Sequence, residues 1–461
     1  MEIPATASTR PAFLKYEDGV LLTSQEADFM VERIISFPIE QVGSGKWLTQ
    51  RGNLEKLNLQ AHYNTMAHCD EFVMSALISH GKMEVLMHEL LVVELWKEKV
   101  FPHIIKQLAA EASTITLQLI LYQETTIVNL LEVILFHREA CEAIGSDCLL
   151  ELTDYCYRKL VYLNTQASED AAYKERTAAE LLDMKPEEDL REKAANMQFA
   201  IAICSLTILR YLTDYMSDLP LSVMARMLDS HDVIMALVPL VEDPPWQRKC
   251  MRSNKIVMEK YVEGKWTQVQ PQDRFKLNKP DAQLWLALYN LIVDTRCRIK
   301  YTYDSFRRDQ VLKLRRHLND ILLDQLHILK DLKWAVEELV LQVAPSNAET
   351  KAGRLIIEQV PELREKLASH RNWKKIAHMQ LETVFSREMD PTAQQQQAQE
   401  LLQMFQFGEM MEQPTCAVCG KVAMQRCSRC KTEWYCGRDC QVSVWKTHKK
   451  ACDILTGNLE K

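Results

Sequence analysis

The chain has 461 residues, of which 47% are hydrophobic and 26% are charged, and it carries a formal net charge of −7. This is the composition of a folded soluble protein, and the length predicts two to four domains. The longest uncharged apolar stretch runs from Phe199 to Leu209. It has about half of the ~20 residues that a transmembrane helix needs, so we expect no membrane partner. The N-terminus lacks the basic-then-apolar order of a signal peptide, which predicts a cytoplasmic or nuclear protein with reduced thiols.

Residues 1–46 are expected to form a short N-terminal lead that prolines interrupt, followed by an α-helical body over residues 47–300. Apolar residues of this body recur at three- and four-residue steps, most clearly at Ile127, Leu130, Leu131, Ile134 and Leu135. The same spacing appears near residues 82–98, 114–136, 147–164, 196–216 and 220–241.

Glycine is rare in the body, with none between Gly145 and Gly264 and none between Gly264 and Gly353. Sheet proteins need glycine-rich turns at short intervals, so the gaps favour a mainly α fold. Helices of this length with short breaks predict an armadillo- or HEAT-like stack. No clean repeated motif is present, and an irregular α-helical bundle is the alternative.

A long helical hairpin is predicted over residues 301–390. Its first arm is one helix from Asp304 to Val343, with apolar residues at alternating three- and four-residue steps and Pro345 as its end. The second arm continues to about Phe385 and is expected to pack antiparallel to the first. A polar helical linker over residues 391–415 then leads to the C-terminal segment.

The chain has 14 cysteines, and half of them cluster between Cys416 and Cys452. The scattered half is best explained as small buried hydrophobic residues. The cluster and one histidine follow the spacing C-x2-C-x7-C-x2-C-x5-C-x3-C-x7-H-x3-C. Eight thiol or imidazole ligands suffice for two closed tetrahedral zinc sites, which leave no position for a catalytic water. The metal therefore replaces a hydrophobic core that so short a segment cannot build.

This spacing resembles the MYND zinc finger family at every ligand, over residues 416–452, with residues 453–461 as a tail. The resemblance implies a cross-brace, whereas the spacing alone would also permit a sequential pairing. In the cross-brace, one zinc is held by Cys416, Cys419, Cys436 and Cys440. The other zinc is held by Cys427, Cys430, His448 and Cys452.

Some members of the family hold short proline-containing peptides in a shallow groove. The groove uses a serine of the second knuckle and a Gln-x3-Trp pattern on the helix. The matching positions here are Ser428, Gln441 and Trp445, which the resemblance nominates as peptide contacts. The alternative for Trp445 is that it packs the finger's own small core, as we expect for Trp434 and Tyr435.

The finger is basic, with eight Lys or Arg and two acidic residues between Cys416 and Cys452. Such a surface could attract nucleic acid or an acidic peptide. Dispersed basic residues usually form a solvated surface, so no nucleic-acid partner is expected.

No catalytic motif is evident. The set Asp229-Ser230-His231-Asp232 resembles a hydrolytic site only as a list of letters. A P-loop, a Gly-x-Gly-x-x-Gly pattern and a Gly-x-Ser-x-Gly pattern are all absent from the sequence. We therefore expect a protein that is not an enzyme.

The body also carries a resemblance, through stretches such as SFPIEQVGSGKW, VVELWKEKVFPHI, LSVMARMLDSHD and QLWLALYNLI. They are similar to a family of axonemal dynein arm assembly factors that end in a MYND finger. The resemblance implies a cytoplasmic scaffold for motile cilia, concentrated near centrosomes or basal bodies. It also implies three kinds of partner: a leucine-rich-repeat assembly factor, chaperones and co-chaperones of the ninety-kilodalton heat-shock system, and dynein arm subunits as clients.

Two alternatives also use a MYND finger. One is a nuclear corepressor-type adaptor, for which the sequence offers no run of five or more basic residues as a nuclear-localisation signal. The other is a SET-type lysine methyltransferase, whose fold is rich in β-strands and whose finger is internal.

Overall fold

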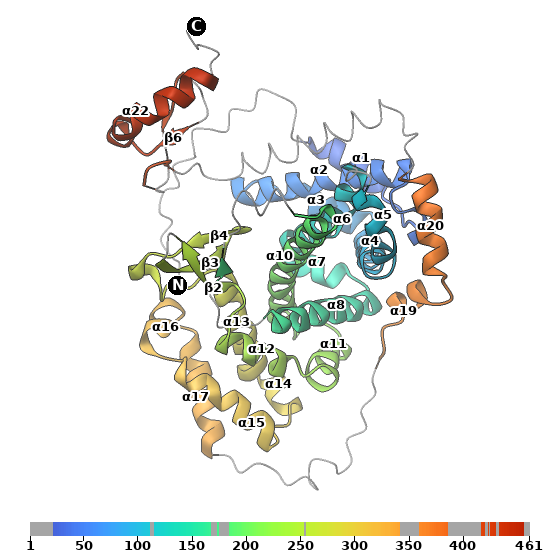
Figure 1. Cartoon of the computed structure of the whole chain (residues 1–461). Helices are drawn as coiled ribbons and strands as arrows, with labels where there is room; N and C mark the ends of the chain where they lie inside the picture. The colour runs from blue at the N-terminus through green and yellow to red at the C-terminus, as the bar shows by residue number, and fades with distance from the viewer. Residues whose placement is uncertain are drawn as a thin grey trace. The chain divides into compact units, whose positions relative to one another are not determined.

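The computed structural model describes residues 22–110, 115–166, 173–174, 184–252, 255–341, 359–385, 416–419, 423, 425–429 and 433–455. The chain divides into two compact units, Met1–Met389 and Asp390–Lys461, and Figure 1 shows that the first is mainly α-helical. The mainly α prediction is therefore confirmed. The predicted lead, body and hairpin instead form one unit.

The first half of this unit is a cluster of helices around one long helix, α10 (Pro186–Asp214), which packs against α5, α6, α8 and α13. Its start follows from sequence, since Pro186 occupies the first turn together with three acidic residues that complement the helix dipole. The other helices of this half are α1 (Ser24–Glu32), α2 (Gly45–Ala67), α3 (Phe72–Ser79), α4 (Met83–Leu95), α5 (Phe101–Ala110), α6 (Ile115–Ile134), α7 (Arg138–Ala143) and α8 (Ser146–Thr165), with a π-helical turn, η2 (Trp96–Val100), between α4 and α5.

Among the described helices, only α10 is long and apolar enough to cross a membrane. Half of its most apolar window is buried within the protein, and four helices cover it. These contacts account for its apolar residues as those of a core helix. This central packing corresponds to the irregular bundle rather than to a stack of repeats.

The second half of the unit contains α11 (Leu221–Ala225), the π-helical turn η3 (Arg226–Ser230), α12 (Val233–Glu242), α13 (Lys279–Val293) and α14 (Thr295–Lys300). It continues with α15 (Ser305–Leu312), the 3-10 turn η5 (Lys313–Arg316), α16 (Asp320–Gln325) and α17 (Leu329–Leu341). One continuous hydrophobic core joins both halves.

The single helix predicted from Asp304 to Val343 is wrong. Asp304 and Asn319 each accept a hydrogen bond from a backbone N–H three residues later and so begin new helices, α15 and α16. The apolar periodicity is real, but its residues pack on α12 and α13 of the same unit. A periodic pattern shows that a face is buried and does not show which element covers it.

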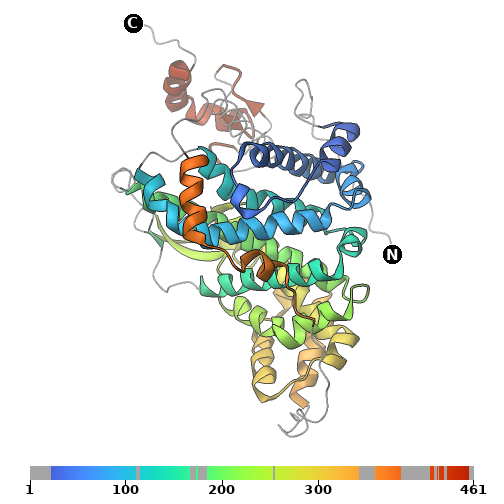
Figure 2. The ribbon, with the colours of Figure 1, turned by 90° about the vertical axis from the view of Figure 1, so that its right-hand side faces the viewer.

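The second arm of the predicted hairpin lies elsewhere too. It forms α19 (Leu363–Ala368) and α20 (Trp373–Thr383), which contact α4, α5, α8 and η2. Figure 2 shows this orange segment crossing the blue and cyan helices of the N-terminal half. We call residues 359–385 the strap. The linker predicted over residues 391–415 lies outside the described residues.

Gln380 anchors the strap, and its side chain is fully buried. Its Nε2 donates to the carbonyl oxygens of Ile39 at 3.1 Å and Val42 at 3.3 Å, and its Oε1 accepts from Trp96 Nε1 at 2.8 Å. Beside it, Gly43 has a φ of +85°, and a Cβ there would lie 2.6 Å from Cγ1 of Val384. Only glycine therefore allows the strap to approach so closely.

A small sheet, absent from the sequence prediction, joins α10. Its strands β1 (Tyr173–Lys174), β2 (Gln247–Arg252), β3 (Lys255–Val262) and β4 (Lys265–Gln268) lie in this order, with β1 parallel to β2 and the other pairs antiparallel. Glu263 and Gly264 both have positive φ and form the β3–β4 turn, a hairpin signal that the sequence did contain. On one face, Phe199 of α10 contacts the rings of Tyr261 and Trp266.

A buried ion network connects the helices of the N-terminal half. The carboxylate of Glu124 on α6 lies 2.8 Å from Lys97 Nζ of η2 and 2.7 Å from Lys159 Nζ of α8. Burial opposes its ionisation, but the two lysines outweigh burial and hold the pKa of Glu124 well below its usual range. Glu94 of α4 extends the network to Arg158, at 2.6 Å, and to Arg364 of the strap, at 3.2 Å.

The substitution Lys159→Met tests this network. Removing one cation leaves buried carboxylates undercompensated, and we expect the free energy of unfolding to fall by about 3–5 kcal/mol. The matched control is Lys193→Met, which removes the partner of Asp189 in an exposed pair on α10 and is expected to cost roughly 0–1 kcal/mol. Urea unfolding followed by circular dichroism measures both. Equal losses would show that the network does not stabilise the fold.

Candidate metal centre

The described residues of the C-terminal segment form one small two-stranded sheet and one helix. Strands β5 (Gln425–Arg426) and β6 (Trp434–Tyr435) pair antiparallel, and helix α22 (Arg438–Leu455) follows. α22 ends at Leu455 and so includes the first three residues of the tail predicted over residues 453–461. The buried apolar residues described in this segment are Cys416, Ala423, Cys427, Tyr435 and Cys452, with Trp434 packed against them. As predicted, Trp434 and Tyr435 are structural. Five buried apolar residues, three of them cysteines, are too few for a stable apolar core.

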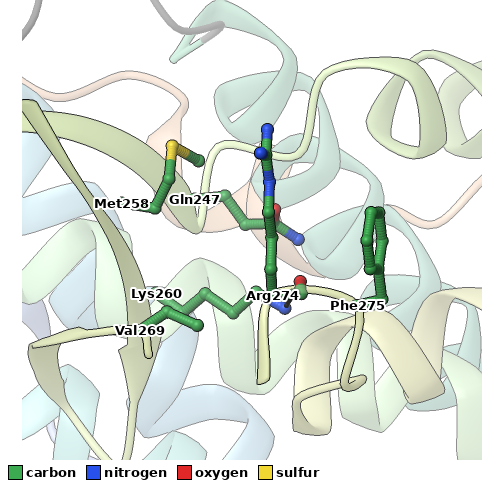
Figure 3. A pocket seen from close by; sticks show the side chains of 6 residues that line it. All are labelled: Gln247, Met258, Lys260, Val269, Arg274 and Phe275. Carbon is green, nitrogen blue, oxygen red and sulfur yellow. Dashed lines mark hydrogen bonds between the residues drawn. The ribbon is translucent and has the colours of Figure 1, made fainter. Parts of the chain in front are cut away.

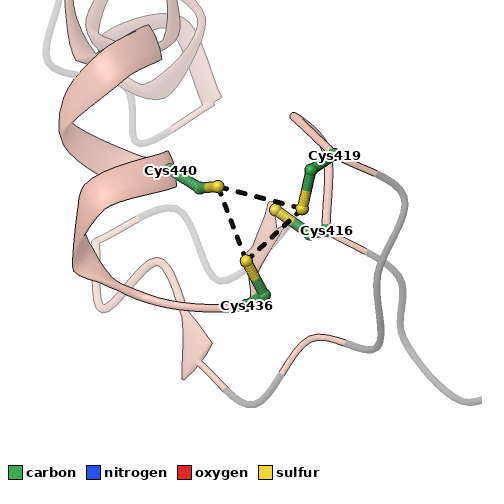
Figure 4. Close-up of side chains that lie close together, drawn as sticks. All are labelled: Cys416, Cys419, Cys436 and Cys440. Atoms are coloured by element: carbon green, nitrogen blue, oxygen red, sulfur yellow. Dashed lines mark hydrogen bonds between the residues drawn. The ribbon is translucent and has the colours of Figure 1, made fainter.

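Four cysteines from separate elements converge on one point (Figure 4). Cys416 and Cys419 lie in the turn before β5, Cys436 follows β6, and Cys440 lies in the first turn of α22. The Sγ of Cys436 lies 3.4 Å from that of Cys419 and 3.5 Å from that of Cys440, and the Sγ atoms of Cys440 and Cys419 are 3.9 Å apart. Tetrahedral ligands about 2.3 Å from a zinc ion are separated by about 3.8 Å, so these sulfurs fit zinc.

Sulfurs this close compete for protons. Burial raises the pKa of the Cys416 thiol, but backbone N–H groups of Cys436, Cys419 and Val418 outweigh it and lower that pKa to about 6. The neighbouring thiol of Cys436 raises the pKa of Cys440 to about 12. A divalent cation relieves this conflict, because it stabilises the thiolates and displaces their protons.

A second group consists of Cys427, His448 and Cys452, whose ligand atoms all lie within 4.8 Å of one another. All three residues are buried, and the His448 ring makes an edge contact with Tyr435. Cys430, the fourth predicted ligand, lies outside the described residues. A tetrahedral zinc site needs four ligands. Cys430 follows Cys427 by three residues in the sequence, which suits it as the fourth ligand of this site.

The two groups interleave along the chain, since Cys427 lies between Cys419 and Cys436. This is the cross-brace that the resemblance implied, and it excludes the sequential pairing for the seven described ligands. The spacing predicted the ligands because they come in twos, each two lying three or four residues apart in sequence. Which of these twos share one zinc ion depends on how β5, β6 and α22 fold together.

Residues 416–452 match the MYND finger family. With this match and seven described ligands in two interleaved groups, the segment is a MYND finger. It holds two zinc-binding sites. MYND fingers are protein-interaction modules, and in this respect the chain is an interaction protein.

The chain is also similar over most of its length to the zinc finger MYND domain-containing protein 10 homolog of Drosophila melanogaster. The two share 29% identity over 454 residues, which cover 93% of this chain and 98% of the fly protein. A SET and MYND domain-containing protein of Dictyostelium discoideum is 52% identical over 33 residues, 7% of this chain and 6% of its own. Ubiquitin carboxyl-terminal hydrolase 19 of Arabidopsis thaliana is 53% identical over 38 residues, 8% of this chain and 6% of its own. No solved structure matches the chain.

The predicted peptide contacts lie on the surface of the MYND finger. Gln441 and Trp445 are four residues apart on α22 and so share one helix face. Trp445 is 36% exposed and lies beside the ring of His448, with 5.8 Å between centroids. Ser428 is exposed in the turn after β5. Trp445 thus contacts a ligand of the second zinc site while keeping an accessible edge, and its role as a peptide contact stays a prediction.

Zinc stoichiometry tests the two sites separately. We expect the purified chain to bind two zinc ions and the Cys440→Ala variant to bind one, because the second group shares no ligand with the first. The control is Cys69→Ala, which removes an exposed cysteine of the helical unit. This variant should still bind two zinc ions. Metal analysis by mass spectrometry gives the count. Loss of both ions on Cys440→Ala would mean that the sites form only together.

Proposed function

We propose that the chain is a non-enzymatic cytoplasmic adaptor for the preassembly of axonemal dynein arms in motile cilia. The MYND finger recruits a partner by binding a peptide, and the helical unit contacts clients or chaperones. The observation that carries the proposal is the similarity to the fly protein over 93% of the chain. It extends through the helical unit, where the stretches typical of the assembly-factor family lie.

The chemistry of the finger supports binding rather than catalysis. The first zinc site is closed by four cysteines, so a metal there has no open position at which to activate water or polarise a substrate. Proteins with different named activities, a SET protein and a ubiquitin hydrolase, match this chain over only 33 and 38 residues. Each match is about as long as the MYND finger alone. These two proteins therefore lend no support to a catalytic activity in the rest of this chain.

Partners of three kinds follow from the proposal. The finger is suited to a leucine-rich-repeat assembly factor that presents an extended segment, because an exposed aromatic side chain and a neighbouring amide can bind such a backbone. Chaperones of the ninety-kilodalton heat-shock system and dynein subunits would contact the helical unit. We place the protein in the cytoplasm, near the basal bodies of ciliated cells.

The alternatives lead to different cellular behaviour. A corepressor-type adaptor would be nuclear, and imaging the tagged chain in multiciliated cells distinguishes it at once. A SET-type methyltransferase would bind S-adenosylmethionine, which calorimetry detects. The helical architecture of the first unit supports neither a SET fold nor its cofactor loop.

The central experiment is an affinity capture from multiciliated cells with the full chain and with a chain truncated at Pro414. Partners lost on truncation need the finger, and partners retained bind the helical unit. Capture of no dynein subunit and no assembly factor by the full chain would overturn the proposed function.

A finer test is Trp445→Ala. We expect it to keep two zinc ions, since Trp445 is not a ligand, and to weaken finger-dependent capture by about tenfold or more, because buried aromatic anchors dominate such interfaces. The matched control is Val442→Ala, at a residue of the same helix that is 65% exposed. Quantitative capture and metal analysis are run together. If Trp445→Ala captures as much partner as the control, Trp445 is not a peptide contact.

A further inference from the structure

The sheet of the first unit has one face packed on α10 and one face turned away from it. The packed face carries Tyr261, Trp266 and Arg248, whose guanidinium lies over the Trp266 ring and pairs with buried Glu259 at 2.9 Å. Side chains alternate between faces along a strand, and the register of β2, β3 and β4 therefore defines the other side. We call it the outer face. It carries Lys249, Met251, Ile256, Met258, Val262 and Lys265.

Apolar side chains are exposed on this face. Ile256 is 62% exposed, Val262 is 41% exposed and Met251 is 38% exposed. Phe275, from the segment that follows β4, is 66% exposed at the end of the same face. Single exposed apolar residues are ordinary, but several that share one sheet face indicate an interaction surface.

A small cavity of about 160 Å³ lies at this end of the face. Met258 and Gln247 line it from the strands, while Arg274 and Phe275 line it from the following segment (Figure 3). Lys260 holds that segment in place, because its buried ammonium donates to the carbonyl oxygens of Arg274 at 3.0 Å and Lys276 at 2.7 Å. The cavity is thus built by specific contacts and has room for one apolar side chain.

The charge of this region is opposite to that of the whole protein. Residues 247–276 contain eight Lys or Arg and three acidic residues, whereas the chain has a net charge of −7. One of the three acids, Glu259, is buried on the packed face with Arg248. Lys249, Lys265 and Arg274 are exposed around the apolar side chains. A locally positive rim on an acidic protein attracts negatively charged partners and orients them.

We propose that the outer face is a second docking site of this protein, which binds an acidic peptide segment of a partner through an apolar anchor side chain. The anchor enters the cavity between Met258 and Phe275, and acidic side chains of the peptide pair with Lys249 and Arg274. A protein segment fits better than a lipid surface, because a concave cavity receives a single side chain and cannot be filled by a flat headgroup layer. The site belongs to the helical unit and is independent of the zinc finger.

The test uses the full chain and a short fluorescein-labelled peptide in which glutamate and leucine alternate. Fluorescence anisotropy measures its binding to the wild type, to Lys249→Glu with Arg274→Glu, and to Ile256→Ser with Phe275→Ser. The controls make the same changes elsewhere: Lys330→Glu with Lys374→Glu, at exposed lysines of α17 and α20, and Leu221→Ser, at a residue that is 74% exposed. The wild type and all four variants keep the zinc finger, so its contribution is common to them. The unfolding temperature of each variant shows whether it folds.

We expect both outer-face variants to bind the peptide about tenfold more weakly than the wild type, and the control variants to bind within about twofold of it. A peptide with lysine in place of glutamate should not bind. Equal binding by wild type and outer-face variants overturns the proposal, as does equal binding of the lysine peptide. Flotation with phosphatidylserine vesicles that depends on these residues, without peptide binding, would identify a lipid site and also overturn it.

Discussion

Burying the carboxylate of Glu124 imposes a constraint that reaches across the helical unit. A charge removed from water is tolerated only where opposite charges and hydrogen-bond donors surround it. Lys97, Lys159 and the hydroxyl of Tyr155 supply these donors from η2 and α8. The helices that carry them must therefore meet α6 in one relative position. Hydrophobic contacts alone would tolerate several arrangements of similar helices, whereas this set of ion pairs is satisfied in one.

The same network recruits a segment far away in sequence. Arg364 of the strap reaches Glu94 across 270 residues, and Gln380 reaches Trp96 across 284. The strap consequently packs over the N-terminal helices. The first unit therefore contains both these helices and the strap, which are far apart in sequence. A separate hairpin would have left the buried groups of α4 and η2 without these partners. The polar contacts of the strap thus fix the last described segment of the helical unit on its N-terminal helices.

The two units are stabilised by different physics. The helical unit has a large continuous hydrophobic core, whereas the described residues of the finger form an apolar cluster of only five buried side chains beside two zinc-binding sites. Metal binding supplies in the finger what apolar burial supplies in the body. The proposed interaction surfaces follow the same division. The finger presents an exposed aromatic edge beside a zinc ligand, and the outer face of the sheet presents apolar side chains within a basic rim. An adaptor with two such surfaces could hold two partners at once.

The sequence by itself determined the features whose causes are local. Helices appeared as apolar residues three and four positions apart, and zinc ligands as pairs three or four residues apart, because one turn of backbone brings such residues together. The division of residues 304–341 into several helices had a local signal in Asp304 and Asn319, which the longer periodicity obscured. The hairpin of β3 and β4 likewise had its signal at Glu263 and Gly264, within a chain whose scarcity of glycine favoured helices.

Only the tertiary structure decided the rest. It placed the strap on the N-terminal helices, gave Glu124 its lysines from two other elements, and assembled the outer face from three strands and the segment after them. It also interleaved the zinc ligands, a pairing for which the spacing left two possibilities. Each of these features joins residues whose separation in sequence carries no information about their distance in space. The free energy that brings them together comes from burial and charge compensation, which depend on the whole fold.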